Sequence, residues 1–173
     1  VGISDQATNN LNLMFNTDVG KKYLISKKGF DNNFVNRLPE FGFSTIANIL
    51  ASIKLAKYMK LGSEDAIITV ATDGADLYLS ELQKTKEDFT GIYDETACAE
   101  IYGQYLKGIS TDNTLELNQK EKERIFNLGY YTWVEQQGVD INEFEKRRDQ
   151  SFWNDHHNYM LSLDNRIKEF NSM

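Results

Sequence analysis

The chain has 173 residues and a formal net charge of −7 at pH 7, with an isoelectric point near 4.9. This length fits a single domain, and an apolar share of 40% is enough to build a core, which argues against wholesale disorder. Lys and Arg are interleaved with acidic residues rather than clustered, so we expect no nucleic-acid partner. No stretch approaches the roughly 20 consecutive apolar residues of a membrane span, so we expect no membrane partner.

Cysteine usage and the first residue bear on where the protein works and how much of it is present. Cys98 is the only cysteine, which excludes an intrachain disulfide and fits a reducing compartment, so we expect a cytoplasmic protein. The chain begins at Val1 rather than at Met, and no signal-peptide pattern is visible. We therefore expect a portion of a longer protein.

Helix breakers are scarce, with one proline and 11 glycines, so the chain is predicted to be rich in helices. The first two helices are expected at 4–16, capped by Ser4, and at 18–28, ended by Gly29. An irregular connection is expected over 30–43. The periodicity is strongest over 44–61, where Ser44 stands at the N-cap position and Gly62 just past the end. Further helices are predicted at 75–86, 94–107, 119–137, 141–148 and 152–170, the third and fourth of them capped by Asn118 and Asp140.

Residues 66–72, with the sequence Ala-Ile-Ile-Thr-Val-Ala-Thr, are predicted to form the one strand of the chain. The run is rich in β-branched residues and apolar at consecutive positions, which is typical of a strand buried on both faces of a parallel sheet. Asp73-Gly74 ends it with a turn. The pattern therefore predicts an α/β fold with many helices.

The start of the 44–61 helix and the end of this strand are the candidate ligand site. Helix N-termini carry free N–H groups, and ligands of open α/β sheets lie beyond the carboxyl ends of the strands. On the residues alone, the simpler interpretation is favoured, in which Ser44 only caps the helix and Asp73-Gly74 only turns the chain.

Other candidate sites are weaker. His156 and His157 are adjacent on a predicted helix and point about 100° apart, so they do not converge on one metal ion, and we expect no metal site. Cys98 lies in an apolar helical window without a neighbouring base and is predicted to be a small buried hydrophobe. The sequence contains no G-x-G-x-x-G, Walker A or G-x-S-x-G motif.

Two segments carry a family resemblance. Gly42-Phe43-Ser44-Thr45 opens a long helix, and Thr72-Asp73-Gly74 with Tyr78-Leu79-Ser80 follows an apolar run. Together they resemble the C-terminal end of cysteine synthase-like enzymes, which belong to the fold type II (tryptophan synthase β) class of pyridoxal-phosphate (PLP) proteins. Residues 130–138 and 152–171 resemble the tail of a longer subgroup of such proteins, described as lyases.

The resemblance implies a fold, a cofactor and a site. Residues 1–173 are then the C-terminal region of a larger α/β enzyme, with a βα part at 1–92 near the cofactor and a helical tail at 93–173. Ser44 would hydrogen-bond the pyridine nitrogen of PLP, and a neutral hydroxyl leaves that nitrogen largely unprotonated. Thr72 is the rival for this role, and Asp73 either binds the cofactor or orders the turn. The implied reaction is β-elimination or β-replacement on a serine-type amino acid, in a lyase or transferase of amino-acid metabolism that is a homodimer at full length.

The departures from the family matter equally. In the family, the Schiff-base lysine, the loop that holds the substrate carboxylate and the glycine-rich phosphate loop all lie upstream of the region resembled here, and Thr45-Ile46 replaces a Ser-Gly pair. We therefore expect no catalytic residue in this chain, no activity of the chain alone, and a partner in the missing N-terminal part of the same enzyme. The alternative is a non-catalytic helical module for protein interaction or regulation.

Overall fold

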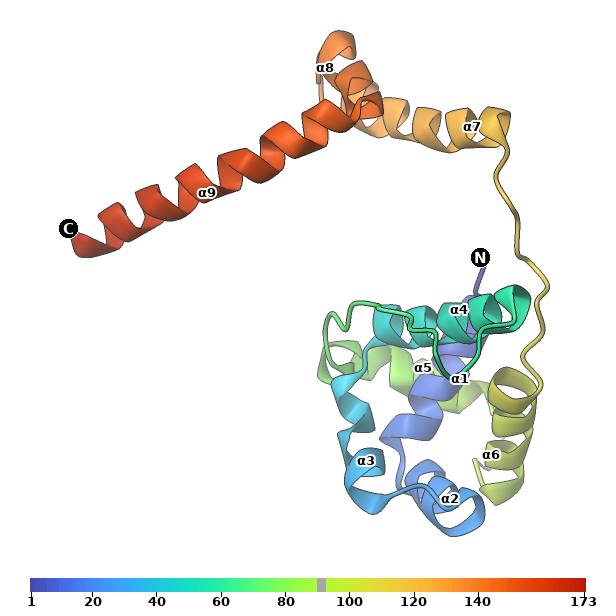
Figure 1. Ribbon diagram of the computed structural model, residues 1–173. Helices are drawn as coiled ribbons and strands as arrows, with labels where there is room; N and C mark the ends of the chain where they lie inside the picture. The colour runs from blue at the N-terminus through green and yellow to red at the C-terminus, as the bar shows by residue number, and fades with distance from the viewer. Residues whose placement is uncertain (90–92) are drawn as a thin grey trace. The chain divides into compact units, whose positions relative to one another are not determined.

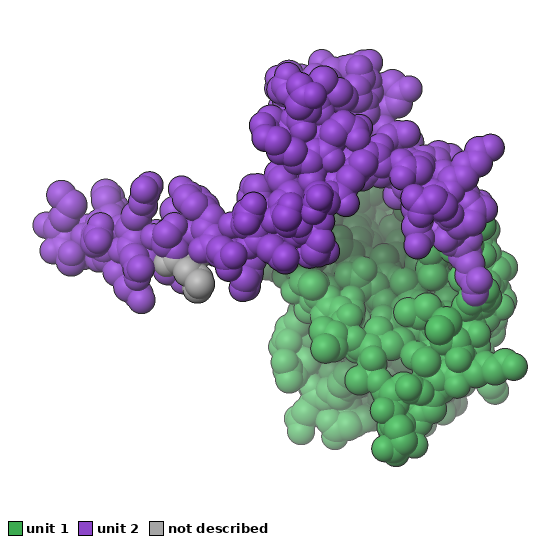
Figure 2. Space-filling model, turned by 45° about the horizontal axis from the view of Figure 1, so that its top comes forward, with its two compact units in different colours: residues 1–115 green, residues 116–173 purple. Residues whose placement is uncertain are grey.

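The computed structural model describes residues 1–89 and 93–173, and every regular element among them is a helix (Figure 1). The chain divides into two compact units, Val1–Leu115 and Glu116–Met173 (Figure 2). The boundary expected after residue 92 falls on residues outside those described and stays a prediction.

Unit 1 contains α1 (Asp5–Asn16), α2 (Asp18–Lys28), α3 (Asn32–Arg37), η1 (Leu38–Glu40), α4 (Phe43–Met59), η2 (Ala75–Tyr78), α5 (Leu79–Asp88), α6 (Glu95–Ile101) and η3 (Tyr102–Lys107). Unit 2 contains α7 (Gln119–Tyr130), η4 (Tyr131–Gln136), α8 (Ile141–Glu145), η5 (Lys146–Arg148) and α9 (Gln150–Ser172).

Helix α1 is the centre of unit 1, and it packs against α2, α4, α5 and α6 (Figure 1). Ser4 caps it as predicted, because the Ser4 Oγ accepts a hydrogen bond from the backbone amide of Ala7 at 3.2 Å. Leu11, Leu13 and Met14 on this helix are fully buried. The apolar contacts of unit 1 thus gather around a helix that is covered on several sides.

Some helix ends lie where the sequence predicts them, and others do not. Gly29 ends α2 in the left-handed conformation at φ 71°, as predicted. Helix α4 begins one residue earlier than expected, with Gly42 rather than Ser44 at the N-cap, and it ends at Lys60 in the left-handed conformation rather than at Gly62. The connection at 30–43 is not irregular, since it contains α3 and η1.

The predicted strand is the main error, because residues 66–72 form no strand in the structure. They run as an exposed, extended segment along the surface of α4, and the side chain of Ile68 is 95% exposed. A strand is stable only when its backbone pairs with a neighbour, and the described residues offer none. The α/β class is therefore wrong for the described part of the chain, in which every regular element is a helix.

Unit 2 is built on a small aromatic centre. Phe144 of α8 is 2% exposed, and its ring lies 4.8 Å from that of Phe126 on α7. Asn118 and Glu121 form the predicted capping box at the start of α7. Helix α9 joins this centre at its first turns, where the Trp153 indole donates to the backbone carbonyl of Arg147 at 3.0 Å.

Among the described residues, no helix is both long and apolar enough to cross a membrane.

Candidate functional site

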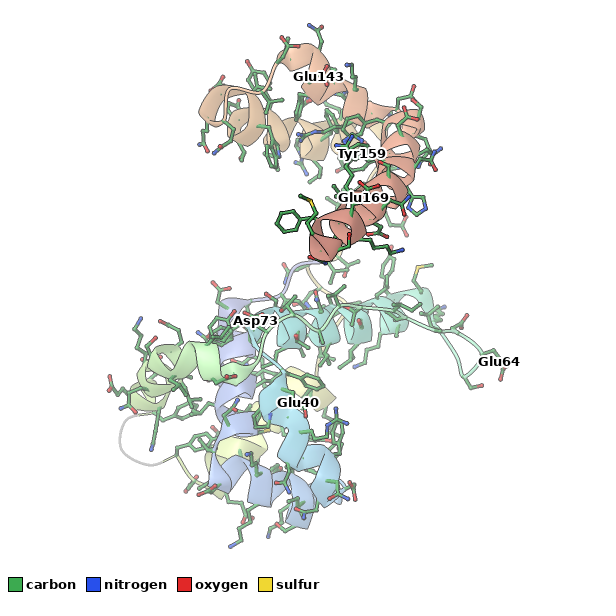
Figure 3. All side chains as sticks on the ribbon, turned by 90° about the vertical axis from the view of Figure 1, so that its left-hand side faces the viewer. Glu40, Glu64, Asp73, Glu143, Tyr159 and Glu169 are labelled. Atoms are coloured by element: carbon green, nitrogen blue, oxygen red, sulfur yellow. The ribbon has the colours of Figure 1, made fainter. Side chains whose placement is uncertain are left out.

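Residues 72–73 lie against the N-terminal end of α4, although they are about 30 positions away in the sequence. The backbone amide of Gly42 donates to the carbonyl of Asp73 at 2.7 Å, and the backbone amide of Thr72 donates to the Thr45 Oγ1 at 3.1 Å. Further along, the Asn48 amide donates to the Val70 carbonyl at 3.1 Å. In Figure 3 the chain accordingly returns from Glu64 to Asp73 alongside α4. The sequence-predicted site residues are thus brought to one place without a sheet.

The close approach of the two segments depends on the glycine at position 42. A Cβ atom built there would lie 2.6 Å from the carbonyl oxygen of Asp73 and 3.0 Å from the ring of Tyr78. No side chain larger than hydrogen fits at that distance from a backbone oxygen without moving the chain. Gly42 therefore serves both as the N-cap of α4 and as the contact point of the returning segment.

The Asp73 carboxylate is held by two hydroxyl groups. Thr72 donates to one carboxylate oxygen and Tyr78 donates to the other. These hydrogen bonds, with Thr72 the larger cause, lower the pKa of Asp73 below its ordinary value, and the same carboxylate raises the pKa of Tyr78. The ring of Tyr78 also packs against Phe43 at 4.6 Å. Asp73 is therefore an ionised group whose oxygens are used to fix the turn.

Ser44 differs from its neighbours because its hydroxyl is free. It lies exposed in the first turn of α4, and no other described residue makes a hydrogen bond to its side chain. That turn has no side-chain cap, so no side chain takes up its free backbone N–H groups. The positive end of the helix dipole also lies there. Thr72, the rival residue, already uses its hydroxyl proton on Asp73. Of the three predicted cofactor residues, Ser44 is thus the one with a donor to offer.

The lysines of α4 are already occupied. The Lys54 ammonium is buried and donates to the backbone carbonyl of Gly2 at 3.3 Å and to the carbonyl and carboxylate oxygens of Asp112 at 2.9 and 3.1 Å. The Lys57 ammonium donates to the carbonyl of Ile109 at 2.6 Å. Both side chains hold the 109–112 segment against α4. Both amines are thus engaged by oxygen acceptors, and neither is free to act as the nucleophile that a Schiff base needs.

The remaining sequence candidates do not form sites. The described residues contain no group of three or more His, Cys, Asp and Glu side chains that could hold a metal. Cys98 is buried as predicted and donates to the Tyr93 hydroxyl at 3.3 Å, and burial raises the pKa of its thiol. His156 contacts the carbonyl of Phe152 within its own helix at 2.8 Å.

Sequence reasoning named Ser44, Thr72 and Asp73 but not the parts played by Thr45 and Tyr78. Thr45 supplies the acceptor that holds Thr72, and Tyr78 supplies the second donor to Asp73. Tyr78 stood in the quoted motif, so the motif was the available signal for it. Comparison with known proteins adds no further constraint, since no family model, curated protein or solved structure matches the chain.

Proposed function

We propose that this chain is the C-terminal part of a PLP-dependent enzyme of the cysteine synthase type, and that Ser44 is its contact to the pyridine nitrogen. The observation that supports this most directly is the free hydroxyl of Ser44 at the uncapped start of α4, beside a turn fixed by Thr72 and Asp73. PLP, when bound, supplies the electron sink for β-elimination or β-replacement on a serine-type amino acid.

The residues of this chain fit one end of the cofactor only. Ser44 offers a neutral donor to a ring nitrogen, while the Asp73 carboxylate is engaged by Thr72 and Tyr78 and stays with the turn. The described glycines with positive φ, Gly29 and Gly138, end separate helices and do not form a phosphate-binding cluster. The amine and the phosphate cradle therefore belong to residues outside this chain, and the chain alone is inactive.

The extended segment beside the site is suited to contact with the rest of such an enzyme. Ile68 and Val70 are 95% and 66% exposed, and Ile67 next to them is also exposed. Adjacent apolar side chains on one open segment are typical of a surface that another part of a protein covers. We propose the N-terminal part of the same enzyme as the covering partner, in a cytoplasmic protein that is a homodimer at full length.

The experiment uses the longer protein, with the residues encoded before Val1, and titrates it with PLP while its visible absorbance is recorded. Ser44→Ala is expected to weaken PLP binding about two- to tenfold, since one net hydrogen bond is worth about 0.5–1.5 kcal/mol. Ser44→Asp is expected to shift the absorbance, because a carboxylate next to the ring nitrogen stabilises its protonated form. Ser63→Ala, at an exposed serine in the turn after α4, is the matched control. It should change neither the affinity for PLP nor the absorbance of the bound cofactor.

A second candidate is a non-catalytic helical module for protein interaction or regulation. The observation in its favour is that Lys54 and Lys57 are both bound to backbone carbonyls. This candidate predicts that the longer protein does not bind PLP. PLP binding that depends on Ser44 would exclude it, whereas absent binding, or binding unchanged by both Ser44 variants, would overturn the first proposal.

A further inference from the structure

Helix α9 presents a largely apolar stripe that no described element of unit 2 covers along most of its length. The helix has 23 residues and packs on η5 at its first turns. On one face of the helix, five large apolar side chains and one histidine recur with alternating steps of three and four residues. We define the α9 seam as Trp153, His156, Met160, Leu163, Ile167 and Phe170.

The seam is exposed where a folded chain would normally bury it. Met160 is 55% exposed, Ile167 49% and Phe170 77%. Steps of three and four residues repeat every seven, which is the pattern of a coiled-coil contact rather than of the wider face that packs on a globular core. The positions between the seam residues are mostly polar: Asn154, Asp155, Asn158, Ser162, Asn165, Lys168 and Glu169.

We propose that the α9 seam pairs with the α9 seam of a second copy of this chain, with the two helices antiparallel. Placing Met160 of one copy opposite Leu163 of the other aligns the whole seam without an overhang. Trp153 then lies opposite Phe170, and His156 opposite Ile167. Each pair occurs twice, so the contact is closed by a two-fold axis and does not propagate.

The residues that flank the seam decide the direction. In the antiparallel register, His157 of one copy lies beside Asp164 of the other, which places an acid next to a base. Tyr159 lies beside Arg166, where the ring and the guanidinium attract each other. These contacts also occur twice. The flanking positions thus complement each other across the two-fold axis.

A parallel pair lacks this complementarity. It would place His156 opposite His156 in the seam, where two polar rings face each other. It would also put Tyr159 beside Asp164 and leave Arg166 beside Asn171, so that no base faces an acid. The antiparallel register therefore satisfies more of the flanking groups, and the proposal commits to it. It uses unit 2 alone and is independent of the proposed PLP site.

The first experiment measures the mass of the 173-residue chain in solution over a range of concentrations. A concentration-dependent dimer is expected. Ile167→Asp places a carboxylate in the seam twice per dimer and is expected to weaken dimerisation by about tenfold or more. Asn165→Asp adds the same charge off the seam and is the matched control, with a dimer close to that of the parent. A chain that stays monomeric, or a dimer that Ile167→Asp leaves intact, overturns the proposal.

The second experiment tests direction and does not depend on a destabilising substitution. His156→Cys and Ile167→Cys are prepared as separate variants. Each is oxidised alone, and an equal mixture of the two reduced variants is oxidised in parallel. Because these positions are 11 residues apart, or about 16 Å along a helix, each variant alone should stay uncrosslinked and only the mixture should form a disulfide dimer. The parent chain controls for Cys98, which is buried. Efficient crosslinking of each variant with itself shows a parallel pair and overturns the antiparallel arrangement.

Discussion

The backbone amide of Thr72 donates to the Oγ1 of Thr45 at 3.1 Å, and this bond joins a buried residue of α4 to the end of an exposed segment. Two side chains of α4 bind the 66–72 segment, Thr45 and Asn48, and the Thr45 contact lies nearer the candidate site. Thr45 is 2% exposed, so its hydroxyl is held within the core of unit 1. It holds the turn at Asp73 together with the Gly42 amide, which donates to the Asp73 carbonyl at 2.7 Å.

Thr45→Val keeps the shape of the side chain and removes the acceptor. The expected cost is about 0.5–1.5 kcal/mol in the free energy of unfolding, measured by urea denaturation, because the freed Thr72 amide can turn to water. Amide hydrogen exchange at Thr72 should rise in the variant. Thr85→Val is the control, since Thr85 is also buried and its hydroxyl donates within its own helix to Glu81. Equal exchange at Thr72 in parent and Thr45→Val would show that the bond does not hold the segment.

The pKa of Asp73 gives a second prediction. Hydrogen bonds from Thr72 and Tyr78 hold this pKa below its usual range in the folded chain. The stabilisation from the carboxylate is then complete above the unfolded pKa of about 3.9 and is lost as the pH falls through the lower folded value. Nuclear magnetic resonance titration of the Asp73 carboxyl carbon should show a midpoint below the ordinary one.

Tyr78→Phe removes one of the two donors while keeping the ring that packs on Phe43. The Asp73 midpoint is expected to move up toward its ordinary value in this variant, and Thr72→Val should move it up as well, since Thr72 is the larger cause. A midpoint that neither substitution moves would mean that the two hydroxyl groups do not set the charge state of Asp73.

The features that the sequence predicts correctly are those decided by residues close together in the chain. The cap at Ser4 and the left-handed residue at Gly29 were predicted correctly, because each is decided by groups within a few residues. The N-cap of α4 is Gly42 rather than Ser44, and the close contact that Gly42 makes with the Asp73 carbonyl was not predicted. That contact joins positions far apart in the sequence and leaves no local signal.

The prediction of a strand at 66–72 was wrong for a related reason. A β-branched run such as 66–72 indicates a preference for extended backbone. In the structure the run has no regular secondary structure and is hydrogen-bonded to α4. Whether an extended segment becomes a strand depends on a neighbour with free backbone groups, and periodicity within the run carries no information about that neighbour. The role of Tyr78 escaped prediction likewise, because it follows from the position of Asp73 and not from the residues around it.

The third prediction compares an isoleucine of the exposed 66–72 segment with a buried isoleucine of α4. Ile68 is 95% exposed, while Ile46 on α4 is 1% exposed. Ile46→Ala is expected to cost about 2–5 kcal/mol in the free energy of unfolding, because it leaves a cavity in the core of unit 1. Ile68→Ala in the same chain should change it by no more than about 0.5 kcal/mol. A large loss from Ile68→Ala, measured by urea denaturation, would show that the segment is buried in solution.

The last prediction concerns the contact between α1 and α2. Gly20 lies in the first turn of α2, and a Cβ atom there would be 1.9 Å from the backbone oxygen of Met14. Gly20→Ala must therefore push two backbones apart, and we expect a loss of about 1–3 kcal/mol or more in the free energy of unfolding. Gly62→Ala is the matched control, because nothing lies within 4 Å of its Cβ position and its φ is not positive. That variant is expected to be neutral or to gain up to about 1 kcal/mol, since alanine restricts the unfolded chain. Both are measured by urea denaturation, and equal stability of the two variants would mean that α1 and α2 are not as closely packed as Gly20 requires.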